Sequence, residues 1–128
     1  ILNEGTDVTI VATGHLVWES ILAGQKLNNM GISAEIINIH TIKPIDEEII
    51  LKSISKSRCI VTAEEHNFLG GLGESISRVL SKNMPLPQEF VATKDTFGES
   101  GTPAELMKKY GLNSDSIVEK VKKVINRK

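Results

Sequence analysis

The sequence predicts an α/β fold of three layers, in which helices cover both faces of a mostly parallel sheet of four to five strands. Short apolar, β-branched segments alternate along the chain with segments of helical period, and this alternation is typical of parallel sheets. The first strand-like segment is apolar on both faces, which indicates a central strand between two helical layers. The 128 residues, 40% hydrophobic and 24% charged, suit one ordinary domain spanning residues 1–128.

The first half of the chain has the pattern of a βαβ unit. We expect a strand over 8–12, a helix over 15–30 that ends at Gly31, and a second strand over 34–39. Glycine reaches the left-handed conformation that ends many helices at low steric cost. The second strand is the more polar of the two and is therefore expected nearer an edge of the sheet. The helix carries a repeat that we expect to be buried, namely Val17, Ile21, Gly24, Gln25 and Asn28, widened by Leu16, Leu22 and Leu27.

The second half continues the alternation. Asp46 is placed to accept hydrogen bonds from the first free amides of a helix over 46–57, and a third strand follows over 58–63. The glycine-rich segment 70–73 then opens a helix that leads to a fourth strand over 89–92. The buried face of this helix is expected to carry Leu72, Ile76, Val79 and Leu80. After it we expect a short helix over 102–110, begun by Thr102-Pro103 and ended by Gly111, and a last helix capped by Asn113 with the apolar stripe Ile117, Val121, Val124 and Ile125.

Charge and cysteine content exclude several classes of protein. The 15 basic and 16 acidic residues leave a formal charge of −1, so no overall field attracts nucleic acid or an anionic membrane. Cys59 lies in an apolar run, where we expect the buried, reduced thiol of a cytoplasmic protein, and a lone cysteine excludes a disulfide framework and a thiolate zinc cluster. No apolar run approaches the roughly 18 residues of a membrane span, and we expect no leader before the first strand. Because the chain starts at Ile1, we expect a fragment of a larger protein.

Polar residues follow two strands that we expect to be neighbours. Right-handed crossovers favour the spatial strand order second, first, third, fourth. The first and third strands then flank a switch point, where their carboxyl ends leave a crevice. Thr13-Gly14-His15 follows the first strand, and Glu64-Glu65-His66-Asn67 follows the third. The polar side chains of interest therefore converge on one end of the sheet.

Gly70-Gly71-Leu72-Gly73 opens a helix directly after a strand and a turn. Free amides at such a helix start can hold a phosphate or a carboxylate, helped by the helix dipole. Ile76 stands where a dinucleotide fingerprint needs glycine, and no Lys-Ser/Thr pair completes a P-loop. The alternative, which we favour, is that the glycines permit a tight turn and close contact between helix and sheet.

Glu64, Glu65 and His66 have side chains suited to acid–base chemistry, because a neighbouring carboxylate raises the proton affinity of histidine. Adjacent residues at a strand end point in opposite directions, so only some of them can face one substrate. We favour a structural or interface role, with His66 bonded to loop backbone or to a neighbouring subunit. The spacing of His, Asp and Glu matches no metal site.

Three other features favour structural interpretations. Gly98-Glu99-Ser100-Gly101 superficially resembles a nucleophile elbow, but it precedes a capped helix, so Ser100 is interpreted as a turn residue. The last helix also carries a basic cluster, but the acidic residues Glu119 and Asp115 interrupt the basic pattern and no aromatic residues interleave, which indicates a solvated helix face. The cluster consists of Lys120, Lys122, Lys123, Arg127 and Lys128. We expect Trp18 to pack on its helix and not to serve as a stacking platform.

Four ordered segments resemble the C-terminal domain of transketolase. They are 7–14 (DVTIVATG), 38–46 (NIHTIKPID), 61–73 (VTAEEHN followed by GGLG) and 97–103 (FGESGTP). The resemblance covers nearly the whole chain. The short, split transketolases look most similar, and 1-deoxyxylulose-5-phosphate synthase and the beta subunits of 2-oxoacid dehydrogenases carry similar domains. Residues 97–101 favour transketolase over both.

The resemblance implies an enzyme that uses thiamine diphosphate and magnesium to move a two-carbon ketol unit between sugar phosphates. In that family the cofactor sits between the diphosphate-binding and pyrimidine-binding domains of a dimer. Those domains or subunits are the implied partners, in a homodimer or higher oligomer. No catalytic, cofactor-binding or metal residue carries over onto this chain, so the implied role is assembly, dimer support and regulation.

The resemblance leads to an expectation about the surface, to an alternative function and to a candidate site. A domain made to dock on a neighbour should expose an apolar patch. The alternative is a free-standing module that senses a phosphorylated metabolite through the helix start at 70–73. In either case the candidate regulatory or anion site comprises Thr13, Gly14, His15, Glu65, His66, Gly70, Gly71 and Gly73.

Overall fold

The computed structural model describes residues 1–39, 45–64, 71–91 and 113–128. The expected helix over 102–110 and its end at Gly111 lie outside these ranges. In chain order the described elements are β1 (Val8–Ala12), α1 (Leu16–Asn29), β2 (Ala34–Asn38), α2 (Glu47–Ser57), β3 (Ile60–Ala63), α3 (Leu72–Asn83), β4 (Gln88–Val91) and α5 (Ser114–Asn126).

The four described strands form one parallel sheet in the order β2-β1-β3-β4, which confirms the predicted order. Ile10 of β1 lies opposite Ile36 of β2 on one side and Val61 of β3 on the other. Thr62 of β3 in turn lies opposite Phe90 of β4. β1 is thus a central strand, and the more polar β2 is an edge of this sheet, as its sequence predicts.

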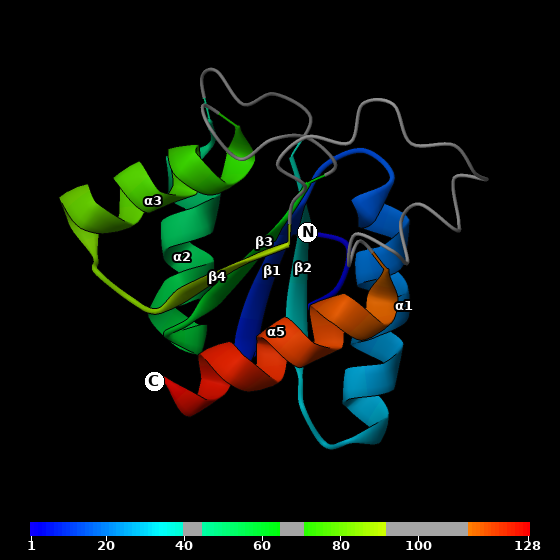
Figure 1. The fold of residues 1–128 in the computed structure, drawn as a ribbon. Helices are drawn as coiled ribbons and strands as arrows, with labels where there is room; N and C mark the ends of the chain where they lie inside the picture. The colour runs from blue at the N-terminus through cyan, green and yellow to red at the C-terminus, as the bar shows by residue number, and fades with distance from the viewer. Residues whose placement is uncertain (40–44, 65–70, 92–112) are drawn as a thin grey trace.

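Helices cover both faces of the sheet, as Figure 1 shows. On one face α1 and α5 pack over a cluster that includes Ile10, Leu27 and Val121. On the other face α2 and α3 pack over a cluster that includes Ile54 and Ile76. Alternate residues of β1 enter the two clusters, since strand side chains alternate between faces. The three-layer architecture predicted from the alternating elements is confirmed.

The residues that begin and end the helices act largely as predicted. The side chain of Asp46 accepts a hydrogen bond from the Ile49 amide at 3.2 Å at the start of α2. The side chain of Asn113 accepts one from the Ser116 amide at 3.0 Å at the start of α5. Gly31 follows α1 with φ of 80°. Specific cap residues therefore determine where these helices begin and end.

The third strand begins two residues later than predicted. Arg58 adopts the left-handed conformation, with φ of 64°, and ends α2 there. A residue in that conformation cannot join a strand, so β3 starts at Ile60 and not at Arg58. Side chains other than glycine rarely adopt this region, and the sequence carries no signal for it. Cys59, between the two elements, is buried as predicted, and burial raises the pKa of its thiol.

The stripe predicted for the buried side of α1 is confirmed for Leu16, Gly24 and Leu27 and wrong for its polar members. The buried residues of the helix are Leu16, Ser20, Ala23, Gly24 and Leu27. The polar members of the predicted repeat, Gln25 and Asn28, are exposed, whereas Val17 and Ile21 are half-buried. Small residues at 20, 23 and 24 let α1 approach the sheet closely, because a Cβ on Gly24 would lie 2.8 Å from Cδ1 of Ile36. The error therefore lies in the polar members of the repeat and in the small residues Ser20 and Ala23, which the predicted stripe left out.

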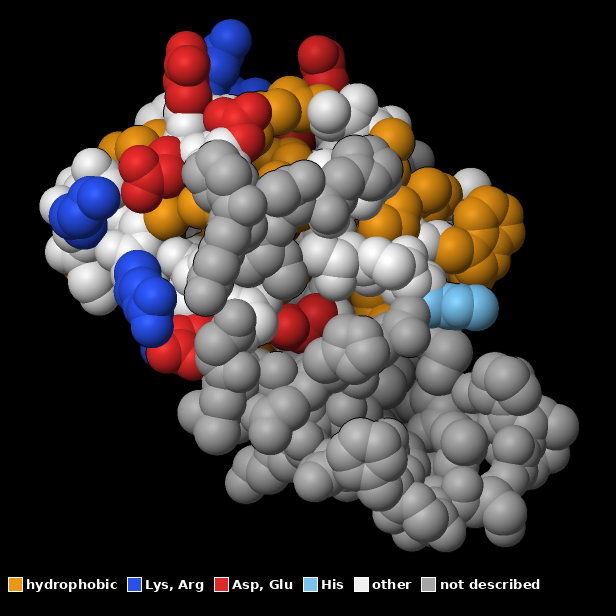
Figure 2. All heavy atoms as spheres, turned by 90° about the horizontal axis from the view of Figure 1, so that it is seen from above, with side chains coloured by type: hydrophobic (Ala, Val, Ile, Leu, Met, Phe, Trp, Pro, Cys, Tyr) orange, Lys and Arg blue, Asp and Glu red, His pale blue; other side chains and the backbone are white. Residues whose placement is uncertain are grey.

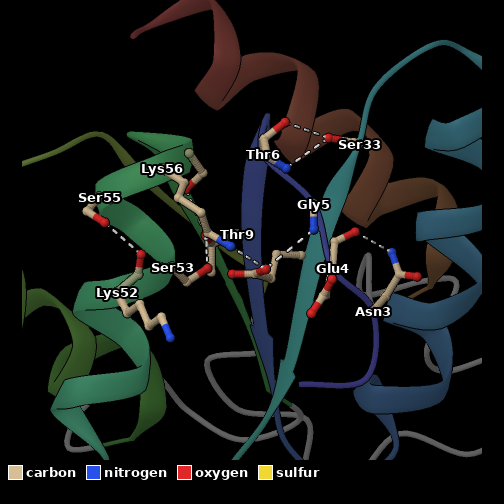
Figure 3. Close-up of polar contacts among 12 residues, drawn as sticks. Asn3, Glu4, Gly5, Thr6, Thr9, Ser33, Lys52, Ser53, Ser55 and Lys56 are labelled. Carbon is tan, nitrogen blue, oxygen red and sulfur yellow. Dashed lines mark hydrogen bonds and ion pairs between the residues drawn. The ribbon is translucent and has the colours of Figure 1, made fainter.

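The segment before β1 lies along the outer edge of β2 (Figure 3). Asn3 forms an antiparallel bridge with Ile36: the Ile36 amide donates to the carbonyl of Asn3 at 2.9 Å, and the Leu2 amide donates to the carbonyl of Ile36 at 2.8 Å. Gly5 is required by this close approach, since a Cβ there would lie 2.4 Å from the carbonyl carbon of Ala34. Backbone hydrogen bonds therefore hold the segment to the sheet edge.

A buried carboxylate joins this segment to α2. Glu35 of β2 is 1% exposed, and its Oε1 accepts hydrogen bonds from Nζ of Lys56 at 2.8 Å and from the Gly5 amide at 3.4 Å. Burial acts to raise the pKa of Glu35, but hydrogen bonds from Lys56, Ser53 and Gly5, together with the charge of Lys56, outweigh it and hold the pKa below its usual value. Beside it, the buried hydroxyl of Thr9 contacts those of Ser53 and Ser57, each at 2.7 Å.

We predict that Lys56→Met destabilises the fold at neutral pH and does so less in acid. The folded-state pKa of Glu35 is lowered, so this group stabilises the fold above its unfolded pKa and loses that contribution as the pH falls through the folded pKa. Losing the lysine should cost about 1–2 kcal/mol at pH 7, less than a fully buried pair because the ammonium faces solvent. Urea unfolding at several pH values measures this, with Lys52→Met on the exposed side of α2 as control. An equal loss for both variants would contradict the assignment.

Candidate functional site

The carboxyl ends of β1 and β3 lie side by side, as the predicted site requires. The Thr13 amide donates to the carbonyl of Ala63 at 3.1 Å, and the Glu64 amide donates to that of Val91 at 2.9 Å. Gly14 turns the chain away from β1 with φ of 56°. His15 then precedes α1 as its N-cap residue and is exposed.

The structure brings the described candidate residues to one end of the molecule. Thr13, Gly14 and His15 follow β1, and Gly71 and Gly73 begin α3, beyond the end of β3. Figure 2 looks onto this end. Glu65, His66 and Gly70 lie outside the described residues, as do the expected turn residue Ser100 and its neighbours, so the acid–base interpretation of Glu65 and His66 stays a prediction.

A buried carboxylate occupies the amides at the start of α3. The Leu72 amide donates to Oε1 of Glu64 at 3.0 Å, and the Gly73 amide donates to Oε2 at 2.6 Å. Glu64 is 3% exposed. Negative charge is stabilised at this end of a helix by the free N–H groups and by the macrodipole. The predicted position for a bound anion, at the start of α3, is therefore filled by the side chain of Glu64.

Sequence reasoning missed this role of Glu64. The sequence pattern groups this residue with its neighbours as a candidate for chemistry, whereas its carboxylate joins the end of β3 to the start of α3. The sequence does hold a signal: Gly71, the N-cap residue of α3, has no side chain to accept a hydrogen bond from the helix. A carboxylate from elsewhere is then needed to satisfy the free amides, and a strand end eight residues before Leu72 supplies it.

The structure supports the packing interpretation of the glycine turn at Gly73. A Cβ on this residue would lie 2.5 Å from Cδ2 of Phe90 and 3.1 Å from Oγ1 of Thr62. Only glycine lets the first turn of α3 approach β3 and β4 this closely. A substitution such as Gly73→Asp would therefore disturb the packing whether or not a ligand binds, and its effect alone does not diagnose an anion site.

α5 is capped in a similar way by a residue distant in sequence. Oε1 of Glu19 on α1 accepts a hydrogen bond from the Ser114 amide at 2.9 Å. Nζ of Lys26, two turns further along α1, donates to Oγ of Ser114 and to Oδ1 of Asp115, each at 2.7 Å. With Asp46 at the start of α2, carboxylates of the chain thus occupy the N-termini of α2, α3 and α5.

The basic residues near the C-terminus partly face one carboxylate. Glu89 on β4 is almost buried and lies 3.8 Å from Nζ of Lys120 and 3.7 Å from Nζ of Lys123. Arg127 pairs with the same carboxylate. These lysines are otherwise open to solvent, as the interpretation of a solvated helix face predicts, and Glu89 offsets part of their charge.

The described residues do not fit thiamine diphosphate or its metal ion. Within residues 1–39, 45–64, 71–91 and 113–128, no group of three or more His, Cys, Asp or Glu is placed to hold a metal. The amides best suited to a diphosphate, at the start of α3, are bonded to Glu64. We therefore derive no chemical step through the cofactor on this chain.

None of the helices in the same ranges is both long enough and apolar enough to cross a membrane.

Comparison with known proteins identifies the class to which this fold belongs. Residues 1–117 match the family model described as the C-terminal domain of transketolase. A 6-deoxy-6-sulfo-D-fructose transketolase subunit from a Clostridium species is 44% identical over 128 residues, covering 100% of this chain and 40% of that protein. A putative transketolase C-terminal section from Methanocaldococcus jannaschii is 46% identical over 123 residues, covering 94% of this chain and 38% of that protein.

A solved structure agrees with the sequence relatives. A split-gene transketolase, described as an inactive beta4 tetramer, superposes with a TM-score of 0.94 at 41% identity, over 98% of this chain and 41% of that one. More distant is a 1-deoxy-D-xylulose-5-phosphate synthase from Synechococcus, 35% identical over 95% of this chain and 19% of its own length. The chain belongs to the transketolase C-terminal domain family. It spans about two fifths of the length of the transketolase relatives that it matches.

We predict that Glu64→Gln lowers the free energy of unfolding by about 1–3 kcal/mol, because a buried, charge-assisted pair of hydrogen bonds is replaced by one neutral acceptor. Thermal and urea unfolding measure the loss. The matched control is Glu74→Gln, which changes a half-buried carboxylate in the first turn of the same helix that pairs with the exposed Arg78 and should cost below about 0.5 kcal/mol. Equal stability of Glu64→Gln and the native chain would show that the carboxylate does not hold the start of α3.

Proposed function

We propose that this chain is the C-terminal domain of a larger transketolase subunit and contributes assembly, not chemistry. The parent enzyme would transfer a two-carbon ketol unit between sugar phosphates, using thiamine diphosphate and magnesium held by its diphosphate-binding and pyrimidine-binding domains or subunits. Support comes from the family match over 1–117 and from 44–46% identity to transketolase relatives. A cytoplasmic enzyme that assembles as a homodimer or higher oligomer is part of this proposal.

The observation that carries the assembly role is the internal use of carboxylates at the helix starts. Glu64, Glu19 and Asp46 bind backbone amides of this chain and so help to hold helices in place. The chain's own amides therefore occupy these carboxylates. A fold stabilised in this way would offer neighbouring domains a defined surface, which is the role that we propose.

A regulatory site at the carboxyl ends of the strands remains a second proposal with a physical constraint. Thr13, Gly14 and His15 lie at that end with the glycine turn. A phosphorylated metabolite that used the amides of Leu72 and Gly73 would first have to displace the carboxylate of Glu64, which is attached to the fold and so competes at high effective concentration. The alternative in which this chain is a free-standing metabolite sensor, and not part of an enzyme, faces the same competition from Glu64.

We predict that the isolated chain of residues 1–128 shows no heat of binding when it is titrated with thiamine diphosphate and magnesium. The described residues offer no metal cluster, and Glu64 holds the amides suited to a diphosphate. The matched control is the complete parent enzyme, assembled with its partner subunit if it has one, which should bind. Micromolar affinity of the isolated chain would contradict the proposal.

The activity of the parent enzyme separates transketolase from the alternative in which the domain belongs to a 1-deoxyxylulose-5-phosphate synthase or a 2-oxoacid dehydrogenase. Transfer of two carbons from a ketose phosphate to an aldose phosphate, with no consumption of pyruvate, is the expected result. Formation of 1-deoxyxylulose 5-phosphate from pyruvate, or decarboxylation of another 2-oxoacid, would replace the proposed activity with one of these alternatives.

A further inference from the structure

The outward face of α1 carries no charge. The two charged residues of the helix, Glu19 and Lys26, are both turned toward the start of α5. Trp18 is 60% exposed, which corrects the expectation that it packs on its helix, and Gln25 is also exposed. The outer surface of this helix is therefore formed by aromatic, aliphatic and amide side chains: Trp18, Ile21, Leu22, Gln25, Asn28 and Asn29.

The outward face of α3 has the opposite character and serves as an internal comparison. It presents Glu74 paired with Arg78, and Lys82 near Glu47 of α2. In Figure 2 hydrophobic side chains gather beside the histidine at the right-hand edge, over α1, whereas charged side chains mark the left-hand side, where α3 lies. A helix whose outer face remains in water usually carries charges there. A helix face that lacks charged residues and exposes a tryptophan is characteristic of the centre of a protein interface.

A groove continues this surface toward the start of the chain. It encloses about 360 Å³ between α1 and the segment that lies along β2, with Leu2, Ile21, Ile32 and Ile36 among its apolar lining. Leu2 is 49% exposed. Because Trp18 and Ile21 lie one turn apart on the helix, the groove and the exposed tryptophan form one continuous surface, on which apolar side chains alternate with amides such as Gln25. We call it the α1 face.

The N-terminal segment indicates what covers the α1 face. Hydrogen bonds of Leu2 and Asn3 with Ile36 fix this segment beside the groove, and Leu2 forms part of the groove wall. On the proposed function, more than half of the parent subunit lies outside this chain, as in the relatives that it matches. Polypeptide joined to Ile1 would then start at the edge of the α1 face and be held there at high effective concentration.

We propose that the α1 face is the surface on which the preceding part of the same subunit packs. This inference rests on the proposed function, since it needs a parent chain that continues before Ile1. The partner surface should be poor in charge, because the centre of the α1 face offers no ion to pair with a buried charge. Of the lining residues of the groove, Glu4 at its margin is the one that carries a charge.

Photo-crosslinking in the complete parent subunit tests the inference. Gln25 is replaced by p-benzoylphenylalanine, which an exposed position on the α1 face should tolerate, and Asn29 serves as a second site if the first variant misfolds. The control places the same group at Ser81, which is exposed on α3. We expect the dominant product from Gln25 to join this domain to peptides that precede Ile1 in the same subunit, and the Ser81 variant to lose that product.

Three results would overturn the inference. They are crosslinks confined to residues 1–128, crosslinks between two subunits that depend on protein concentration and so identify a second copy, and the absence of crosslinks above the Ser81 background. The readout does not involve catalysis. A parent enzyme without ketol transfer would therefore contradict the proposed function while leaving the crosslinks to decide the docking surface.

Discussion

Two hydrogen bonds from the first turn of α3 to the carboxylate of Glu64 determine the structure of the chain's candidate site. They join the end of a central strand to the start of a helix and satisfy amides that glycine at the N-cap leaves without a partner. The helix can then approach the sheet so closely that Gly73 has no room for a side chain. An anion-binding geometry is thus present in this domain, but a residue of the chain occupies it, and that constraint favours an accessory role.

Much of the fold follows from local patterns in the sequence. Strand order follows from right-handed crossovers, and the starts of α2 and α5 follow from Asp46 and Asn113, whose side chains accept the expected hydrogen bonds. The deviations arise where tertiary contacts decide. Arg58 adopts a left-handed conformation for which its residue type gives no signal, and the buried side of α1 is chosen by how closely small residues let the helix approach β2.

The candidate site was predictable in its location and much less so in its chemistry. Parallel strands bring Thr13 and Glu64 to the same end of the sheet, which topology alone establishes. The glycine at the N-cap of α3 indicates that an outside acceptor is needed, but no local pattern shows that this acceptor is Glu64, eight residues before Leu72. The error in α1 has a further consequence, since the repeat expected to be buried includes residues that form the uncharged outer face of the domain.

The most direct test of this account is to follow the backbone amide resonances of Leu72 and Gly73 by NMR while inorganic phosphate, and then a sugar phosphate, is added at constant ionic strength. If Glu64 holds these amides, both resonances should stay in place when phosphate is added to the native chain. In the Glu64→Ala variant, which lacks the carboxylate that the amides bind, both resonances should move when phosphate is added. Saturable shifts of both resonances in the native chain at millimolar phosphate would contradict the account and identify the start of α3 as a ligand site.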